Sequence, residues 1–122
     1  MSVNIKYDKE HLWVKADAAE AVIGVTDYGQ ELLGEIIFVE LPDTGGAIEC
    51  GQVLCVVESL KTVTEINAPC QGQIVEVNEA LLGSPELINK DPDNDGWLVK
   101  VRYVSLKEDL MTPEEYEIYI ND

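Results

Sequence analysis

Short apolar runs separated by turn residues dominate the chain and predict β-strands. The runs recur at about ten-residue spacing, which is typical of a small sandwich or barrel. Turn signals separate them, most clearly the PDTGG segment at residues 42–46. The predicted strands are Ala21–Val25, Ile36–Leu41, Val53–Val57, Val63–Asn67, Gln73–Val77 and Trp97–Tyr103.

Helices are predicted only as short segments between and after these strands. Thr26 is placed to cap a helix of one or two turns that runs through Leu33 and ends at Gly34. Ser84 followed by Pro85 predicts a single helical turn. The tail contains two capping-box patterns and predicts a short helix at the end of the chain: Ser105 with Glu108, and Thr112 with Glu115.

One lysine stands at the centre of the strand-rich segment. The strands Val53–Val57 and Val63–Asn67 flank the sequence ESLKT, so the simplest arrangement is a hairpin with Lys61 at or beside its tip. A side chain at such a tip is expected to be exposed.

The composition fits one folded domain with a strongly negative surface. A chain of 122 residues with 46% apolar residues can bury one core, and we expect a single domain over residues 1–122. The 24 acids against 8 bases give a net charge of −16, and such a surface repels nucleic acid and anionic membranes. No stretch reaches the ~18 to 20 apolar residues of a membrane span, and the first residues lack a signal-peptide pattern. We therefore expect a cytoplasmic protein, or the mature form of a processed one, without nucleic-acid or membrane partners.

The residue types that usually carry catalysis or bind metals do not form a recognisable site. The three cysteines, at positions 50, 55 and 70, lack the CxxC spacing of zinc sites. The only histidine, His11, lies in the polar segment KEHLW, far in sequence from every cysteine, so no nucleophile–base pair can be assembled. The run DPDNDG at residues 91–96 matches the first half of a calcium loop, but Arg102 occupies the position of its essential glutamate. We interpret that run as an acidic loop, and we expect no metal site and no enzyme.

The segment around Lys61 is nearly symmetric about that residue. Gly51 precedes it by ten residues and Gly72 follows it by eleven, which suggests two similar strand pairs that meet at the turn. This segment resembles the lipoyl and biotinyl carrier domains, in which a hairpin-tip lysine is acylated by the cofactor. Biotinyl domains usually have methionine on both sides of the lysine, whereas Leu60 and Thr62 stand here, so the resemblance favours lipoate.

Longer motifs resemble one member of that superfamily, the glycine cleavage system H protein. They cover nearly the whole chain in family order: KEHLWV (9–14), IGVTDYGQELLGEIIFVELPDTGG (23–46), VVESLK (56–61), APCQGQIVEVNEAL (68–81), SPELINKDP (84–92) and DGWLVKV (95–101). The resemblance implies a mainly β barrel-sandwich hybrid with short helices and a C-terminal helix. It also implies lipoic acid in amide linkage to Lys61.

The resemblance further implies a carrier and not an enzyme. In H proteins the lipoyl disulfide accepts an aminomethyl group from glycine decarboxylase, presents it to aminomethyltransferase, and is reoxidised by dihydrolipoyl dehydrogenase. A lipoyl ligase or transferase must attach the cofactor, and we expect it to recognise the turn through Glu58, with Ser59 beside it. In the family, acids near the arm hold the amine-loaded cofactor. Glu65 keeps the acid four residues after Lys61, and Glu10 keeps one before His11.

Three positions depart from the family pattern. Leu12 replaces the acid that usually lies between histidine and tryptophan, Asp93 replaces a tyrosine, and Gly29 replaces an alanine. An amine beside leucine loses a charge-assisted partner worth about 1.5 to 3 kcal/mol. The alternative is therefore an H-like lipoate-binding protein that serves another pathway, such as lipoate relay or sulfur oxidation. Both hypotheses keep lipoate on Lys61.

Overall fold

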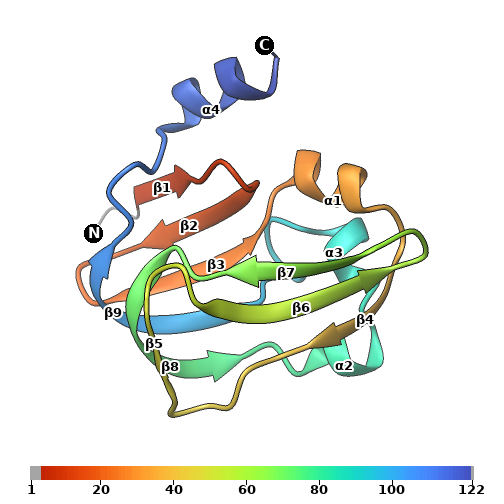
Figure 1. The fold of residues 1–122 in the computed structure, drawn as a ribbon, viewed down its shortest axis with the longest axis horizontal. Helices are drawn as coiled ribbons and strands as arrows, with labels where there is room; N and C mark the ends of the chain where they lie inside the picture. The colour runs from red at the N-terminus through yellow and green to blue at the C-terminus, as the bar shows by residue number, and fades with distance from the viewer. Residues whose placement is uncertain (1–3, 122) are drawn as a thin grey trace.

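Two antiparallel β-sheets make up most of the fold, with four short helices in the described part of the chain (Figure 1). The structure is a computed structural model that describes residues 4–121. The larger sheet has the strand order β1-β2-β3-β9-β8-β5, and the smaller sheet has the order β4-β6-β7. The elements are β1 (Asn4–Tyr7), β2 (Leu12–Ala16), β3 (Glu20–Val25), α1 (Asp27–Leu33), β4 (Ile36–Glu40), β5 (Ala47–Ile48), β6 (Val53–Ser59), β7 (Val63–Asn67), β8 (Cys70–Val77), α2 (Ala80–Gly83), α3 (Leu87–Lys90), β9 (Val99–Leu106) and α4 (Pro113–Ile120). The predicted mainly β barrel-sandwich fold is confirmed.

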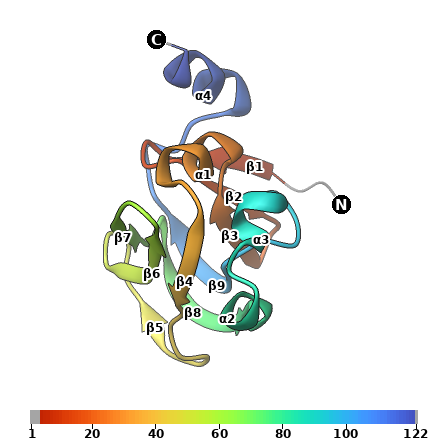
Figure 2. The same cartoon turned by 90° about the vertical axis from the view of Figure 1, so that its right-hand side faces the viewer.

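The inner faces of the two sheets enclose a shared hydrophobic core. Val14 of β2, Val57 of β6 and Val101 of β9 have no exposed surface and belong to the same cluster of buried side chains. Burial of apolar surface stabilises a fold by roughly 25 cal/mol per Å², so this cluster supplies the main driving force. Figures 1 and 2 show α4 standing beyond β1, apart from the two sheets. There the Tyr116 ring stacks on the Tyr7 ring with the centroids 4.5 Å apart.

Helix α1 begins and ends where the sequence predicts. The Thr26 hydroxyl accepts a hydrogen bond from the Gly29 amide at 3.0 Å, which satisfies one of the free donors of the first turn. Gly34 ends the helix with a φ of 87°, a left-handed conformation that glycine adopts without steric cost. The chain then turns directly into β4, so the end of α1 lies beside the small sheet.

The last strand is displaced from its prediction, and one capping box is wrong. β9 begins at Val99 rather than Trp97 and continues to Leu106, because β8 begins already at Cys70 and pairs with it along its whole length. Ser105 therefore lies inside β9, opposite Gln71, and does not cap a helix with Glu108. The other capping box, Thr112 with Glu115 at the start of α4, is confirmed.

The helical turn at Ser84 is also displaced. Helix α3 begins at Leu87, and no side chain caps it. The Leu87 amide donates instead to the Ser84 carbonyl at 3.1 Å, so Ser84 and Pro85 form a turn ahead of the helix. Sequence reasoning also missed the elements β1, β2, β5 and α2.

The segment KEHLW is not merely a polar lead-in. Leu12 and Trp13 begin β2 and are buried, with 1% and 2% of their surfaces exposed. The Trp13 indole donates a hydrogen bond to the Pro92 carbonyl at 2.9 Å, which ties β2 to the loop of residues 91–96. Among residues 4–121, no helix combines the length and the apolar character needed to cross a bilayer.

Candidate functional site

Lys61 lies in the tight turn that joins β6 to β7, and its side chain is exposed. The Ser59 amide donates to the Thr62 carbonyl at 2.8 Å, which closes the turn. Leu60, at the same tip, has 70% of its surface exposed. The structure therefore places Lys61 at the protruding end of the hairpin, where the sequence analysis expected it.

The Ser59 side chain holds this turn from inside. Ser59 is buried, and its hydroxyl oxygen accepts hydrogen bonds from the Lys61 amide at 3.2 Å and the Thr62 amide at 3.1 Å. Donors in a turn that would otherwise rely on water are thus satisfied by a side chain of the same turn. The backbone of Lys61 is consequently fixed, while its side chain is exposed.

The segment between α1 and β4 supports the tip from the other side. The Leu60 amide donates to the Glu35 carbonyl at 3.0 Å. The stem of Lys61 passes over Gly34, where an added methyl group would lie 3.0 Å from the Lys61 Cε atom. Sequence reasoning missed this contact, because Gly34 was interpreted only as the end of α1. The positive φ at the end of α1 already explains a glycine at this position, so nothing in the sequence indicated that Gly34 also contacts Lys61.

A groove of about 280 Å³ runs beside the tip between α1, β7 and β2. Its walls are mostly apolar and include Leu12, Leu32 and Ile66, while Glu10 is the carboxylate at its edge. The groove includes Thr62, the residue next to Lys61. It can therefore receive a flexible apolar chain attached at Lys61, with a positively charged end near Glu10.

The replacement at Gly29 belongs to this groove. An added methyl group at Gly29 would lie 2.9 Å from the Cβ atom of His11, which is closer than packed side chains tolerate. His11 itself has a φ of 70°, which is uncommon for a residue other than glycine. Burial lowers the pKa of His11, and its Nδ1 atom lies 2.9 Å from the Tyr116 hydroxyl. The absence of a side chain at Gly29 thus allows the turn at His11 to pack closely against α1.

The predicted acidic residues do not all gather at the groove. Glu10 lines it, and the Asn67 amide group donates to the Glu10 carboxylate at 3.4 Å. Glu58 and Glu65 point to the outer face of the small sheet, away from Thr64 and the buried Ile66, which face the groove. The alternation of side chains along a strand separates these two groups. Leu12 is buried at the groove floor. Of the residues that line the groove, Glu10 alone carries a carboxylate.

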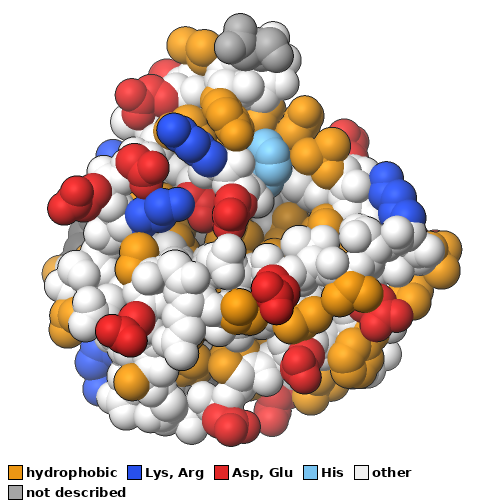
Figure 3. Space-filling view, in the orientation of Figure 1, with side chains coloured by type: hydrophobic (Ala, Val, Ile, Leu, Met, Phe, Trp, Pro, Cys, Tyr) orange, Lys and Arg blue, Asp and Glu red, His pale blue; other side chains and the backbone are white. Residues whose placement is uncertain are grey.

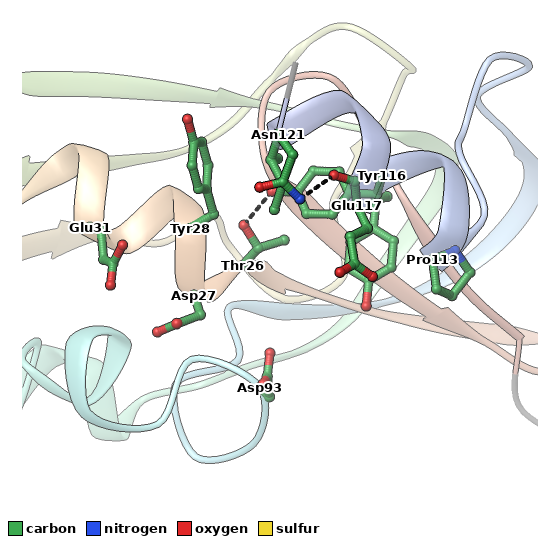
Figure 4. A pocket seen from close by; sticks show the side chains of 11 residues that line it. Thr26, Asp27, Tyr28, Glu31, Asp93, Pro113, Tyr116, Glu117 and Asn121 are labelled. Atoms are coloured by element: carbon green, nitrogen blue, oxygen red, sulfur yellow. Dashed lines mark hydrogen bonds between the residues drawn. The ribbon is translucent and has the colours of Figure 1, made fainter.

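Asp93 lies in a different place, in a cavity of about 440 Å³ between α1 and α4 (Figure 4). Tyr116 lines this cavity, and its hydroxyl lies 2.7 Å from the Thr26 hydroxyl. The lining includes four carboxylates, of Asp27, Glu31, Asp93 and Glu117, and neither lysine nor arginine. Lys61 does not line it, so the Asp93 replacement affects a surface other than the hairpin tip.

The thiols and the loop of residues 91–96 give no evidence of catalysis or metal binding. Burial raises the pKa values of Cys55 and Cys70 to about 12, so both stay protonated at neutral pH. The Asp91 carboxylate accepts hydrogen bonds from its own loop, including the Asp95 amide at 3.2 Å. Within the described range 4–121, no three His, Cys, Asp or Glu side chains are grouped to hold a metal ion.

Comparison with known proteins finds the H-protein family that the sequence motifs resemble, along nearly the whole chain. The family model described as "Glycine cleavage H-protein" matches residues 5–122. The glycine cleavage system H protein of Herpetosiphon aurantiacus is 47% identical over 116 residues, which cover 95% of this chain and 90% of that protein. The namesake from Bacteroides thetaiotaomicron is 42% identical over 120 residues, which cover 97% and 95%.

A solved structure agrees in fold. The crystal structure of a glycine cleavage system H protein from Mycobacterium marinum superimposes with a TM-score of 0.90 at 36% sequence identity. The superposition covers 98% of both chains.

Proposed function

Because the chain belongs to the glycine cleavage H-protein family, a family of non-enzymatic lipoyl carriers, we propose that Lys61 is its lipoyl attachment site. The observation that carries this proposal is the position of Lys61 on a fixed, protruding turn. A swinging arm needs a rigid anchor, so that only the arm moves between partners. The hydrogen bonds of Ser59 and Glu35 supply that rigidity.

The charge pattern of the sequence supports the same residue. Lys61 is the only lysine or arginine between Lys15 and Lys90. The strands that form the hairpin and its neighbours in sequence therefore contribute no second amine for an acylating enzyme. The exposed side chain also leaves the amine accessible for acylation.

The groove beside the tip fits a bound lipoyl arm in size and character. When attached, the lipoyl group supplies a disulfide that accepts a one-carbon amine and two electrons. Leu12, Leu32 and Ile66 offer an apolar wall for the methylene chain, which excludes water from it. Glu10 offers one carboxylate for a positively charged end, held in place by Asn67. Glu58 and Glu65 lie on the outer face of the hairpin, where partners can reach them, whereas Ser59 fixes the turn from its buried side.

The partners follow from the carrier role. We expect glycine decarboxylase, aminomethyltransferase and dihydrolipoyl dehydrogenase to act on the arm, and a lipoyl ligase or transferase to attach it. The acidic surface favours partners with basic docking faces and speeds their encounter at low ionic strength.

The second candidate function is an H-like carrier for another pathway. Leu12 is the observation that favours it, because the groove floor is apolar where an acid would contact an amine. Such a carrier would keep lipoate on Lys61 but would transport a group without positive charge.

Two measurements test these proposals. Protein produced in a host with a lipoyl ligase should gain one lipoyl mass on Lys61, and Lys61→Arg should abolish that gain. The lipoylated protein should then support glycine-dependent decarboxylation with glycine decarboxylase from the same organism. Lipoylation of another lysine would refute the site. Activity no higher than that of the unlipoylated control would refute glycine cleavage and favour the second candidate.

A further inference from the structure

The outer face of the small sheet carries alternating apolar and acidic side chains beside Lys61. In one row of the sheet Phe38 lies opposite Glu58, and Glu58 lies opposite Val63. In the next row Glu40 lies opposite Val56, and Val56 lies opposite Glu65. Directly opposed residues of antiparallel strands point to the same side of a sheet. We call this surface the tip face; it consists of Phe38, Glu40, Val56, Glu58, Val63 and Glu65.

Two of the three apolar residues of the tip face, Phe38 and Val63, are largely exposed. Phe38 has 54% of its surface in contact with solvent, and Val63 has 63%. A bulge between Ile36 and Phe38 also leaves Ile37 exposed on β4. Clustered apolar surface of this kind, bordered by charge, marks protein interaction sites more often than scattered single residues do.

The charges of the tip face have one sign. Its three charged residues are glutamates, and the nearest base in the sequence is Lys61 itself. Figure 3 shows red and orange side chains alternating over the region where the β6–β7 hairpin lies in Figure 1. A complementary partner must therefore present lysine or arginine around an apolar hollow.

We propose that the tip face is the docking surface of the enzyme that attaches lipoate to Lys61. This inference rests on the proposed function. The unmodified amine extends only one side chain beyond the tip, so the attaching enzyme must contact the surface directly beside it. Enzymes that act on the far end of a lipoyl arm meet the cofactor at a distance from this surface. The partner thus receives Phe38 in its hollow and pairs its bases with Glu40, Glu58 and Glu65.

The attachment step needs only an activated lipoyl donor such as a lipoyl adenylate. The neutral Lys61 Nζ atom forms an amide bond with the lipoyl carbonyl carbon, and the bond from that carbon to the phosphate oxygen of the adenylate breaks. Adenosine monophosphate leaves, and the amine loses a proton to solvent. Docking on three strands aligns Nζ for this attack, since the hairpin turn cannot rotate against β4.

The test measures lipoylation of the full unmodified chain by a purified lipoate–protein ligase with ATP and lipoate. Phe38→Ser and Glu40→Lys should each lower kcat/KM by about tenfold or more, because they remove a central apolar anchor and reverse a docking charge. Matched controls are Val104→Ser, an apolar side chain of β9 that is 75% exposed, and Glu108→Lys, an exposed acid outside the sheets. Both controls should stay within about twofold of the wild-type rate. Glu40 is exposed, so Glu40→Lys carries the test if Phe38→Ser fails to fold.

Each outcome decides between the proposals. Equal kcat/KM values for the tip-face variants and the controls would overturn the docking surface. Normal lipoylation of the tip-face variants, combined with reduced glycine-dependent decarboxylation, would assign the face to another partner and equally overturn it. If the wild-type protein itself accepted no lipoate on Lys61, the proposed function would fail instead.

Discussion

The Ser59 hydroxyl accepts two amide hydrogen bonds within the turn that carries Lys61. Ser59→Ala removes this acceptor and leaves the Lys61 and Thr62 amides to water. We expect the free energy of unfolding to fall by about 1 kcal/mol, since the donors are near the surface. The lipoylation rate should fall several-fold, because the backbone of Lys61 is held less firmly. Urea unfolding and ligase kinetics measure the two effects.

The control for this prediction is Ser105→Ala. Ser105 is an exposed serine of β9, distant in sequence from the turn, and the same change there should leave the lipoylation rate unaltered. Equal rates for Ser59→Ala and wild type would show that the turn is fixed by its backbone alone.

At the scale of elements, the end of α1 supports the hairpin through Gly34. Gly34 and Gly45 both have positive φ, 87° and 93°, but only Gly34 lies against the Lys61 side chain. Substitution by alanine should destabilise the fold at either position, because a Cβ atom strains this conformation. Only Gly34→Ala should also slow lipoylation, since its Cβ atom would press on the Lys61 stem. Equal lipoylation rates for the two alanine variants would contradict this account.

The free energy of unfolding should depend on pH through His11, which contacts Tyr116 of α4. Burial lowers the pKa of His11 below its ordinary value of 6.5. As the pH falls through 6.5, the unfolded chain takes up the proton before the folded protein does, so the free energy of unfolding decreases. His11 is the only histidine, and a comparison with a variant that lacks it between about pH 7.5 and 5.5 separates its titration from that of the carboxylates.

His11→Asn isolates this effect. Asparagine tolerates the positive φ of His11 better than most residues and does not titrate. The variant loses the contact with the Tyr116 hydroxyl and should be less stable at pH 7.5. Its stability should nevertheless change less than that of the wild type between the two pH values. A variant with an unchanged pH dependence in urea unfolding would exclude His11 as the cause.

The elements that the sequence predicted correctly are those determined by neighbours in the chain. Thr26 and Gly34 mark the ends of α1 by local chemistry, and the alternation in Val63–Asn67 defines β7. β2 escaped prediction because Leu12, Trp13 and Val14 are all buried, which hides the period of two that an exposed strand shows. β9 was displaced because its pairing with β8, and not its composition, sets its ends.

The same distinction applies to the site. The position of Lys61 at the hairpin tip was predictable because the turn residues and the flanking strands are adjacent in sequence. The support from Glu35, the groove and the separation of Glu65 from Glu10 depend on how α1 and β2 pack against the hairpin. No local sequence pattern encodes these contacts, so they can be identified only in the folded structure.

At the scale of the whole molecule, repulsion among acids opposes the compact state. The net charge is −16, and within residues 4–121 only three ion pairs offset it. Salt screens repulsion between exposed charges with a Debye length of about 10 Å at 0.1 M and about 3 Å at 1 M. The free energy of unfolding is therefore expected to rise with the concentration of sodium chloride. The four carboxylates that line the cavity between α1 and α4 allow this effect to be tested by substitution.

Asp93→Asn removes one of the four carboxylates that line this cavity (Figure 4). Tyr7 also lines the cavity, and its pKa is raised, first by burial and second by the negative charge of Asp93. The charge of Asp93 therefore acts on the other groups of this cavity. We expect the variant to raise the urea midpoint at low salt and to match the wild type at 1 M salt, where the repulsion is screened. Glu20→Gln is the control, since Glu20 lies 4.0 Å from Arg102, and its neutralisation should not raise the midpoint. If Asp93→Asn lowers the midpoint at low salt, the carboxylate stabilises its loop more than it repels its neighbours, and the replacement at this position has a structural rather than an electrostatic origin.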